Sequence, residues 1–294
     1  MTLADVKNFV PQSLREPLGR ALKNAQDQYW LASFGHQAGL VPPRELMHDG
    51  PQSYKDFKEN GAEFFRYYVE LCDLQPHEKI LDVGSGIGRK TWPLVGYLNQ
   101  RGSYDGLELV KSAVEWCTEK YTGKHPNFRF QQIDVFNAHY NPQGEYQAAE
   151  YRFPFGDDEF DLVVLNSVFT HMLPAEVENY LREVARVLKP GGRSLISFFL
   201  LNPESIELLE QDKSMIVLPH EQAPVRMQSR EKPEEAIGFE EAYVLALYER
   251  CGLEIEDPVR YGYWCGREKF LSCQDLIVAI KSSLAGTAGV SPAR

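Results

Sequence analysis

The chain has 294 residues and ordinary globular composition, with 43% hydrophobic and 25% charged residues. Its 42 acidic residues outnumber its 31 basic residues, for a formal net charge of -11. An acidic chain without a basic stripe is a poor candidate for sequence-independent nucleic-acid binding, which needs Lys and Arg against phosphates. No apolar stretch approaches the ~20 residues that span a bilayer, and residues 1–20 lack the apolar centre of a signal peptide.

The cysteines favour a reduced, cytoplasmic protein. They are odd in number, and none of their spacings is that of a zinc knuckle. No His and carboxylate cluster has metal-ligand spacing either, so we expect no metal. The five are Cys72, Cys117, Cys251, Cys265 and Cys273.

The predicted elements begin with helices over residues 1–75, where aromatic side chains recur at helical spacing. Short apolar strands then alternate with helices. Strands are expected at residues 79–83, 103–109, 127–135, 160–168 and 193–201. Helices are expected at residues 89–100, with Pro93 in the first turn, at 110–122 and at 174–188, where the glycines of "KPGG" would cap the helix.

Residues 202–238 interrupt this alternation. They are rich in Glu, Pro and Gln; "SMIVLP" and "VRMQS" within them are candidate short strands, and we expect "SMIVLP" to be buried against the rest of the protein. A helix at 239–252 and strands at 253–257 and 274–281 follow. The alternation predicts an α/β fold with a mostly parallel, doubly wound sheet. The expected organisation is a helical segment at 1–75, a core at 76–201, an insert at 202–238, completion of the sheet at 239–283 and a flexible tail at 284–294.

The stretch "ILDVGSGIGRK" places three glycines, Gly84, Gly86 and Gly88, directly after the first strand. Ligands of open α/β sheets bind there, beyond the carboxyl ends of the strands. The spacing is not that of a P-loop, and the third glycine comes one position too early for a dinucleotide fingerprint. A tight turn that binds no ligand is the alternative.

Acidic residues accompany the glycine turn. Glu108 ends the second strand, twenty residues after Gly88, and a carboxylate there can accept hydrogen bonds from both hydroxyls of a ribose. Asp134 ends the third strand and can accept a hydrogen bond from an adenine amino group, whereas Asp82 can face an ammonium group. The implied ligand carries an adenosine and an amine. A carboxylate at a strand end is not core, so Glu108 should add little to the stability of the free protein; a solvated Glu108 without a ligand is the alternative.

The blocks "ILDVGSGIG", "GLEL", "QIDV", "FDLVVLNSVFTHM" and "RVLKPGGR" occur in this order over roughly residues 75–200. Together they resemble the class I S-adenosylmethionine-dependent methyltransferases. The resemblance implies a Rossmann-like, seven-stranded sheet whose last strand is antiparallel. It also implies S-adenosyl-L-methionine as cofactor and S-adenosyl-L-homocysteine as product. The residues then expected at the cofactor are Asp82, Gly84, Ser85, Gly86, Gly88, Glu108, Leu109, Asp134, Val135 and Asn166.

A methyl acceptor with a hydroxyl group needs its proton removed, and His171, a few residues after the fourth strand, is the candidate base. A turn histidine that packs or caps the next helix is the alternative. Five further residues are candidates for the substrate pocket, although an ordinary loop and a turn held by packed aromatics would explain them as well. They are Tyr151 and Arg152, before the fourth strand, and Tyr263, Trp264 and Arg267, between the last two strands.

The predicted function is S-adenosylmethionine-dependent methylation of a small molecule, with O-methylation of a secondary metabolite or sugar favoured. Carbon or nitrogen methylation, a catalytically silent binding protein and an NAD-linked oxidoreductase are the alternatives. Base methylases usually carry Pro-Pro-Tyr after the Asn or Asp that follows the fourth strand, whereas Ser167-Val168-Phe169 follows Asn166 here. We therefore expect no nucleic acid and no membrane among the partners. The N-terminal helices and residues 202–238 are the expected lid over the substrate.

Overall fold

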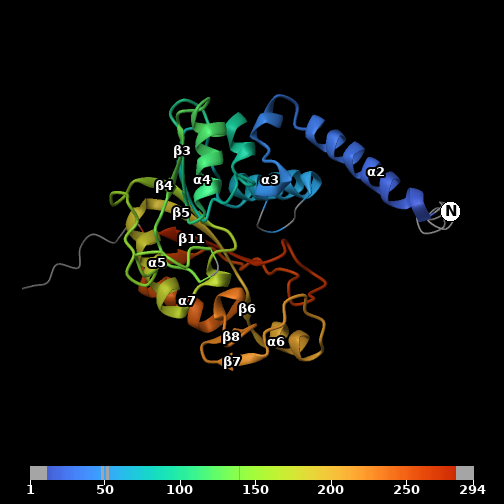
Figure 1. Cartoon of the computed structure of the whole chain (residues 1–294). Coiled ribbons are helices and arrows are strands. Elements are labelled where there is room, and N and C mark those ends of the chain that lie inside the picture. The colour runs from blue at the N-terminus through green and yellow to red at the C-terminus, as the bar shows by residue number, and fades with distance from the viewer. Residues whose placement is uncertain (1–11, 48–49, 51–52, 139, 283–294) are drawn as a thin grey trace, which may run out of the picture.

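The computed structural model describes residues 12–47, 50, 53–138 and 140–282, so the expected tail at 284–294 lies outside the described residues. Within these ranges the chain forms a seven-stranded sheet of order β10-β11-β5-β4-β1-β2-β3 (Figure 1). The first five strands are parallel, and β11 is antiparallel to β5 and to β10. The predicted Rossmann-like sheet with an antiparallel last strand is confirmed. The strands are β1 (Lys79–Val83), β2 (Ser103–Glu108), β3 (Phe128–Gln132), β4 (Phe160–Leu165), β5 (Leu188–Phe198), β10 (Leu253–Ile255) and β11 (Asp275–Lys281).

Helices cover both faces of the sheet because alternate residues of each strand point to opposite sides. In β1, Leu81 and Val83 belong to the apolar cluster under α5 (Pro174–Val187) and α7 (Glu241–Arg250). The intervening Ile80 joins a second cluster, with residues of α3 (Tyr54–Glu70), η3 (Trp92–Gly96) and α4 (Lys111–Cys117). Figure 1 shows these two helical layers on either side of the strands. Both faces of the central strands are thus dry, and β4 is buried over nearly its whole length.

The strand order reverses beside β1. The chain runs outward from β1 to β2 and β3 and then returns to place β4 on the other side of β1. The loops after β1 and β4 therefore diverge and leave a crevice at the carboxyl ends of these strands, which is where open α/β sheets bind ligands.

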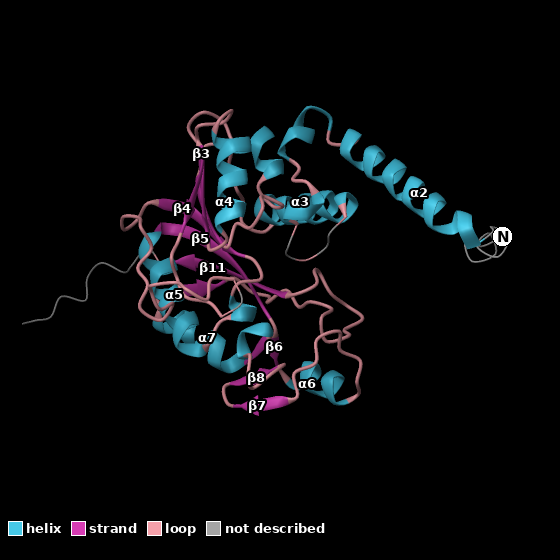
Figure 2. Cartoon of the chain, viewed as in Figure 1, coloured by secondary structure: helices cyan, strands magenta, loops and turns pink. Residues whose placement is uncertain are grey.

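Residues 200–240 build a second, four-stranded sheet of order β6-β9-β8-β7. Its strands are β6 (Leu200–Leu201), β7 (His220–Gln222), β8 (Val225–Met227) and β9 (Ile237–Glu240), and α6 (Pro203–Glu210) lies beside it (Figure 2). We refer to residues 202–238, the insert predicted to be a lid, as the lid segment. Its expected strand at "VRMQS" is present as β8, but "SMIVLP" forms no strand. Leu218 is buried there, whereas Met215 and Val217 are 64% and 61% exposed, so the expected burial of "SMIVLP" is wrong for half of its apolar residues.

Two helix predictions also need correction. The segment predicted as a helix at 89–100 forms only the 3-10 helix η3, since Pro93 and Gly96 limit helix propagation. The glycines of "KPGG" do not cap α5, which ends at Val187 with an extended C-cap. Instead β5 begins at Leu188, and Gly191, with φ +78°, lies where the register between β4 and β5 shifts.

The N-terminal segment consists of α2 (Gln12–Ala32), η1 (Gly35–Leu40), η2 (Arg44–Leu46) and α3. In Figure 1, α2 extends away from the rest of the molecule. Its last turns are fixed to η2 by an ion pair of Arg44 with Asp27. None of the described helices is long and apolar enough to cross a membrane.

Candidate functional site

A cavity of about 490 Å³ lies at the carboxyl ends of the parallel strands. This volume is within the range of small-molecule sites. Its walls come from the glycine turn after β1, the ends of β2 and β3 and the loop after β4. The lid segment adds Ile216, Gln228, Glu235 and Ala236, and the N-terminal segment adds Leu46. The cavity therefore lies beside the glycine turn and Glu108, as predicted, whereas Asp82 and Asp134 do not line it.

The three glycines of the turn have positive φ angles, of +78° at Gly84, +54° at Gly86 and +82° at Gly88. They differ in what surrounds them. A Cβ atom at Gly84 would lie 2.5 Å from Val168, and one at Gly88 would lie 2.8 Å from the Tyr121 hydroxyl, so protein atoms exclude side chains there. A Cβ atom at Gly86 would meet nothing within 4 Å. Gly84 and Gly86 line the cavity, whereas Gly88 does not, and at Gly86 the backbone itself is open to a ligand.

The carboxylate of Glu108 is fixed at the end of β2 by three backbone amides. One oxygen accepts hydrogen bonds from the amides of Leu109 and Val110, at 2.8 and 2.9 Å, and the other accepts one from Gly86 at 2.7 Å. Glu108 is only 8% exposed and lines the cavity. The side chain thus links the glycine turn to the start of α4, where a negative charge is also stabilised by the helix dipole.

Two buried acceptor oxygens lie under the glycine turn. Asp82 lies in β1, and Asn166 directly follows the adjacent strand β4; they are 2% and 4% exposed. Asp82 accepts a hydrogen bond from the hydroxyl of Tyr104 at 2.7 Å, and Asn166 donates one to Tyr68 at 2.8 Å. Each keeps one buried side-chain oxygen with no hydrogen-bond partner among the described residues. Unmet buried acceptors are costly, so a donor group of a ligand would be favoured at Asn166, which lines the cavity, and at Asp82 if the ligand reaches past the lining.

Burial also changes the titration of Asp82. It raises the pKa of this carboxyl to about 6, although the positive charge of Lys90 and the hydrogen bond from Tyr104 act in the opposite direction. A cationic ligand group would therefore favour the ionised form.

His171 ends the short helix η5 (Phe169–His171) and lines the cavity. Its Nδ1 atom lies 2.9 Å from the carbonyl oxygen of Glu234 in the lid segment. A carbonyl can only accept, so Nδ1 carries the hydrogen and the lone pair of the neutral ring is on Nε2. The ring of Tyr140 packs edge-on against it, with 6.5 Å between ring centroids. This arrangement orients an imidazole that can accept a proton through Nε2.

Of the other residues predicted for the cofactor, some line the cavity and some do not. Ser85, Leu109 and Val135 line the cavity together with Gly84, Gly86, Glu108 and Asn166. Asp134 is exposed, does not line the cavity and accepts a hydrogen bond from the side chain of Asn141 at 3.0 Å. A contact of Asp134 with adenine stays a prediction.

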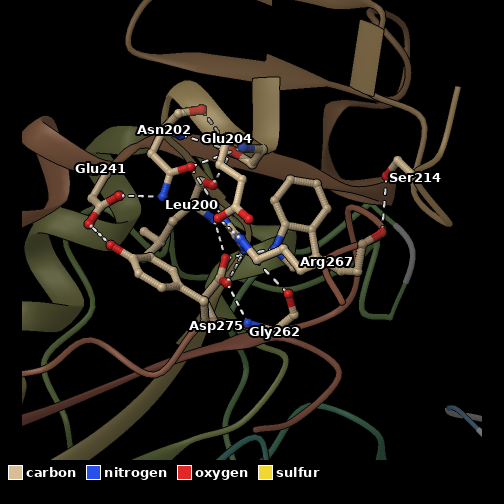
Figure 3. A network of polar contacts seen from close by, with 11 residues as sticks. Leu200, Asn202, Glu204, Ser214, Glu241, Gly262, Arg267 and Asp275 are labelled. Atoms are coloured by element: carbon tan, nitrogen blue, oxygen red, sulfur yellow. Dashed lines mark hydrogen bonds and ion pairs between the residues drawn. The ribbon is translucent and has the colours of Figure 1, made fainter. Parts of the chain in front are cut away.

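The five residues predicted for the substrate pocket do not line this cavity. Trp264 and Arg267 are 0% and 4% exposed, and both bond to the buried carboxylate of Asp275, at 2.7 and 3.0 Å (Figure 3). Arg267 also pairs with Glu204 of α6 at 2.8 Å. They join the 262–267 loop, the lid segment and β11 in one polar network and have no face toward the cavity, so we do not retain them as substrate ligands.

The remaining three of these residues are placed by local packing. Tyr263 packs against Phe270, with 4.9 Å between ring centroids. Tyr151 is packed against the core under α5, and Arg152 makes an exposed ion pair with Asp157 at 3.4 Å. The two alternatives that the sequence left open, an ordinary loop and a turn held by packed aromatics, describe these positions.

Some cavity residues were not found by sequence reasoning. Lys90 and Tyr140 stand in or near the recognised blocks but carry no spacing signal of their own. Ser167, just after β4, and Gln274, just before β11, meet at the cavity although they are more than a hundred positions apart. Only the strand order brings such pairs together.

Comparisons with known proteins agree with this geometry. A family model described as a methyltransferase domain matches residues 81–196, from β1 to β5. The structure is similar to that of the PH0226 protein from Pyrococcus horikoshii, with a TM-score of 0.54 and 17% identity, over 79% of this chain and 93% of that chain. Residues 81–196 therefore contain a methyltransferase domain, and the fold is that of the class I S-adenosylmethionine-dependent methyltransferases.

Curated relatives of this methyltransferase are distant. It is 25% identical over 184 residues to the ubiquinone/menaquinone biosynthesis C-methyltransferase UbiE of Vibrio parahaemolyticus, covering 61% of this chain and 65% of that protein. It is 25% identical over 147 residues to phosphoethanolamine N-methyltransferase 1 of Arabidopsis thaliana, covering 49% of this chain and 26% of that protein. The match thus spans less than two thirds of either relative.

S-adenosylmethionine is the cofactor of this methyltransferase family, and the cavity fits it. The cofactor carries an ammonium group and a carboxylate on one carbon, a ribose with two hydroxyls and an adenine. The two unmet acceptors of Asp82 and Asn166 match the ammonium group in chemistry, and the open backbone at Gly86 allows a close approach. Within the described ranges, no group of three or more His, Cys, Asp or Glu side chains is arranged to hold a metal ion.

Proposed function

We propose that this methyltransferase transfers the methyl group of S-adenosylmethionine to a hydroxyl of a small molecule, of the secondary-metabolite or sugar kind. The observation that carries the proposal is His171, whose Nδ1 bond to Glu234 leaves Nε2 as proton acceptor in the cavity that also contains Gly86 and Glu108. Alkylation of a hydroxyl releases a proton, and an oriented neutral imidazole is suited to take it.

We assign the cofactor to one side of the cavity. Glu108 would hold the ribose hydroxyls, and Asp82 and Asn166 would accept hydrogen bonds from the ammonium group. Gly84, Ser85 and Gly86 would follow the methionine portion, and Leu109 and Val135 would pack beside the nucleoside. These assignments rest on the acceptor oxygens, the burial and the open backbone described above.

The chain's own part in the reaction is positioning, exclusion of water and removal of the proton. The bound cofactor supplies an electrophilic methyl group on a sulfonium. The acceptor oxygen must approach this methyl in line with the departing sulfur, so the walls of the cavity must fix its direction. Ile216 and Ala236 of the lid segment and Leu46 of the N-terminal segment are apolar cavity residues that would exclude water.

Carbon or nitrogen methylation is the second candidate, since the names of the two relatives above specify a C-methyltransferase and an N-methyltransferase. A neutral amine attacks through its own lone pair, so nitrogen methylation does not need an oriented imidazole to the same degree. A carbon acid must lose a proton, as a hydroxyl does, so His171 would serve carbon methylation as well. A small molecule remains the proposed partner, with neither nucleic acid nor membrane. A cytoplasmic location remains a proposal from the cysteine pattern.

The test has two parts. Titration calorimetry with S-adenosylmethionine separates a methyltransferase from a catalytically silent binding fold. Mass spectrometry then follows the addition of one methyl group across phenolic, glycosidic and acidic acceptors. For an accepted hydroxyl compound, His171→Ala should lower kcat by about 10²–10⁴-fold. His125→Ala, at the opposite edge of the sheet, is the matched control, and equal rates for both variants would refute base-assisted hydroxyl chemistry.

A further inference from the structure

Ser167 has a backbone conformation that serine rarely adopts. Its φ angle is +63°, in the left-handed region, and it lies exposed at the cavity directly after Asn166. Non-glycine residues in this region are strained, and such strain persists only where the surroundings enforce it. Here the amide of Ser167 donates a hydrogen bond of 2.7 Å to the hydroxyl of Ser197 on β5. A glycine would fit the backbone better, so the hydroxyl of Ser167 is retained at a cost.

The side chain of Ser167 belongs to a closed set of hydrogen bonds with Ser197 and Gln274. The hydroxyl of Ser197, which is fully buried, donates to the Gln274 carbonyl oxygen at 2.6 Å. The Gln274 amide nitrogen donates to the hydroxyl oxygen of Ser167 at 3.0 Å. Each bond fixes the roles of the next, so both the amide of Gln274 and the hydroxyl of Ser167 are held in one orientation.

Two donor hydrogens of these three residues are not used within the set. A serine hydroxyl has one hydrogen and a glutamine amide has two. The hydroxyl hydrogen of Ser167 and the second amide hydrogen of Gln274 have no acceptor among the residues that the structure describes. Both residues line the cavity, and the two donor atoms are 3.0 Å apart. A ligand group with two oxygens on one carbon can accept from both at once.

We propose that Ser167 and Gln274 bind a carboxylate of the methyl acceptor, next to the cofactor. This rests on the proposed function, because it assigns part of the same cavity to the acceptor. The pair favours a carboxylate over a neutral amide, because a carboxylate offers one oxygen to each of the two donors. Ser167 follows Asn166, which we assign to the cofactor, so the carboxylate would orient the rest of the acceptor toward the methyl group.

The experiment uses benzoate as probe and benzamide as its neutral counterpart, with the full chain saturated with S-adenosylhomocysteine. Ligand-observed NMR measures the affinity of each probe. Ser167→Gly removes the hydroxyl and relieves the backbone, and Gln274→Glu replaces the free donor by a negatively charged oxygen. Asp73→Gly is the matched control, because Asp73 is also a non-glycine residue with positive φ, +48°, but lies after α3 at the opposite edge of the sheet.

Benzoate should bind the parental protein and the Asp73→Gly control equally, and about tenfold or more weakly in Ser167→Gly and Gln274→Glu. Benzamide should bind the parental protein more weakly than benzoate. Ser167→Gly should melt at the same or a higher temperature. The proposal is overturned if benzoate does not bind, if either variant binds it as the parent does, or if benzamide binds as well as benzoate. Calorimetry with S-adenosylmethionine on the same samples tests the proposed function separately, since loss of cofactor binding is read without the probe.

Discussion

Replacing Glu108 by alanine should weaken both the free protein and its complex with the cofactor. The carboxylate accepts three amide hydrogen bonds, of 2.7, 2.8 and 2.9 Å, from Gly86, Leu109 and Val110. Hydrogen bonds to a charged group contribute roughly 1.5–3 kcal/mol each, but water can enter the emptied position from the cavity and replace part of them. We therefore expect a loss of about 2–3 kcal/mol in the free energy of unfolding, which corresponds to a melting temperature lower by about 4–12 °C.

The two effects of Glu108→Ala are measured separately. Differential scanning calorimetry without ligand gives the stability, and titration calorimetry gives the affinity for S-adenosylmethionine, which should fall by about 10–100-fold. Glu115→Ala, a 66% exposed carboxylate on α4, is the matched control and should change neither quantity. An unchanged melting temperature would refute the structural role of the three amide bonds, and an unchanged affinity would refute the assignment of Glu108 to the ribose.

Three further outcomes are expected. Gly86→Val should bind the cofactor more than about tenfold more weakly in calorimetry. Gly191 also has a positive φ and no atom within 4 Å of its Cβ position, so Gly191→Val is the control and should lose only stability. Equal cofactor binding by the two variants would show that Gly86 serves only the turn. Because burial raises the pKa of Asp82 to about 6 and the ammonium group needs the ionised form, cofactor affinity should fall as the pH drops below about 6, and Asp82→Asn should bind weakly without this pH dependence. Arg267→Met should lower the free energy of unfolding by about 3–5 kcal/mol, because it removes the positive partner of the buried Asp275 carboxylate. The double variant Arg267→Met with Asp275→Asn should recover part of this loss. Urea denaturation measures both, and an Arg267→Met variant as stable as the parent would refute the role of the network.

The strands of the core could be predicted from sequence because each is a short apolar run followed by a turn, as in the 160–168 segment that contains β4. The same regularity placed the glycine turn and Glu108 at one edge of the sheet. The three amide hydrogen bonds of Glu108 could not be predicted, since the directions of those amides are set by the folded turn. From the sequence we predicted that Glu108 lies outside the core, whereas in the structure it is buried, with 8% of its surface exposed.

The aromatic stretch around Trp264 shows a second limit. Aromatic and Arg side chains together are typical of both ligand pockets and buried polar clusters, and composition does not distinguish the two. The deciding residue is Asp275, the first residue of β11, whose carboxylate accepts from Trp264 and Arg267 inside the protein. The left-handed backbone of Ser167 could not be predicted either, because it depends on a hydrogen bond to Ser197, thirty positions away.

The place of β11 in the sheet has a consequence for how the protein is made. Of the described strands β11 is synthesised last, yet it lies between β5 and β10. The carboxylate of its first residue, Asp275, accepts a hydrogen bond from the backbone amide of Leu200 and so fixes the start of the second sheet. A nascent chain on the ribosome can therefore form the β1–β5 part of the sheet early, but an open edge of β5 remains until the last strand emerges. The glycine turn that we assign to the cofactor would then be complete before Gln274, which we propose for the acceptor, has been synthesised.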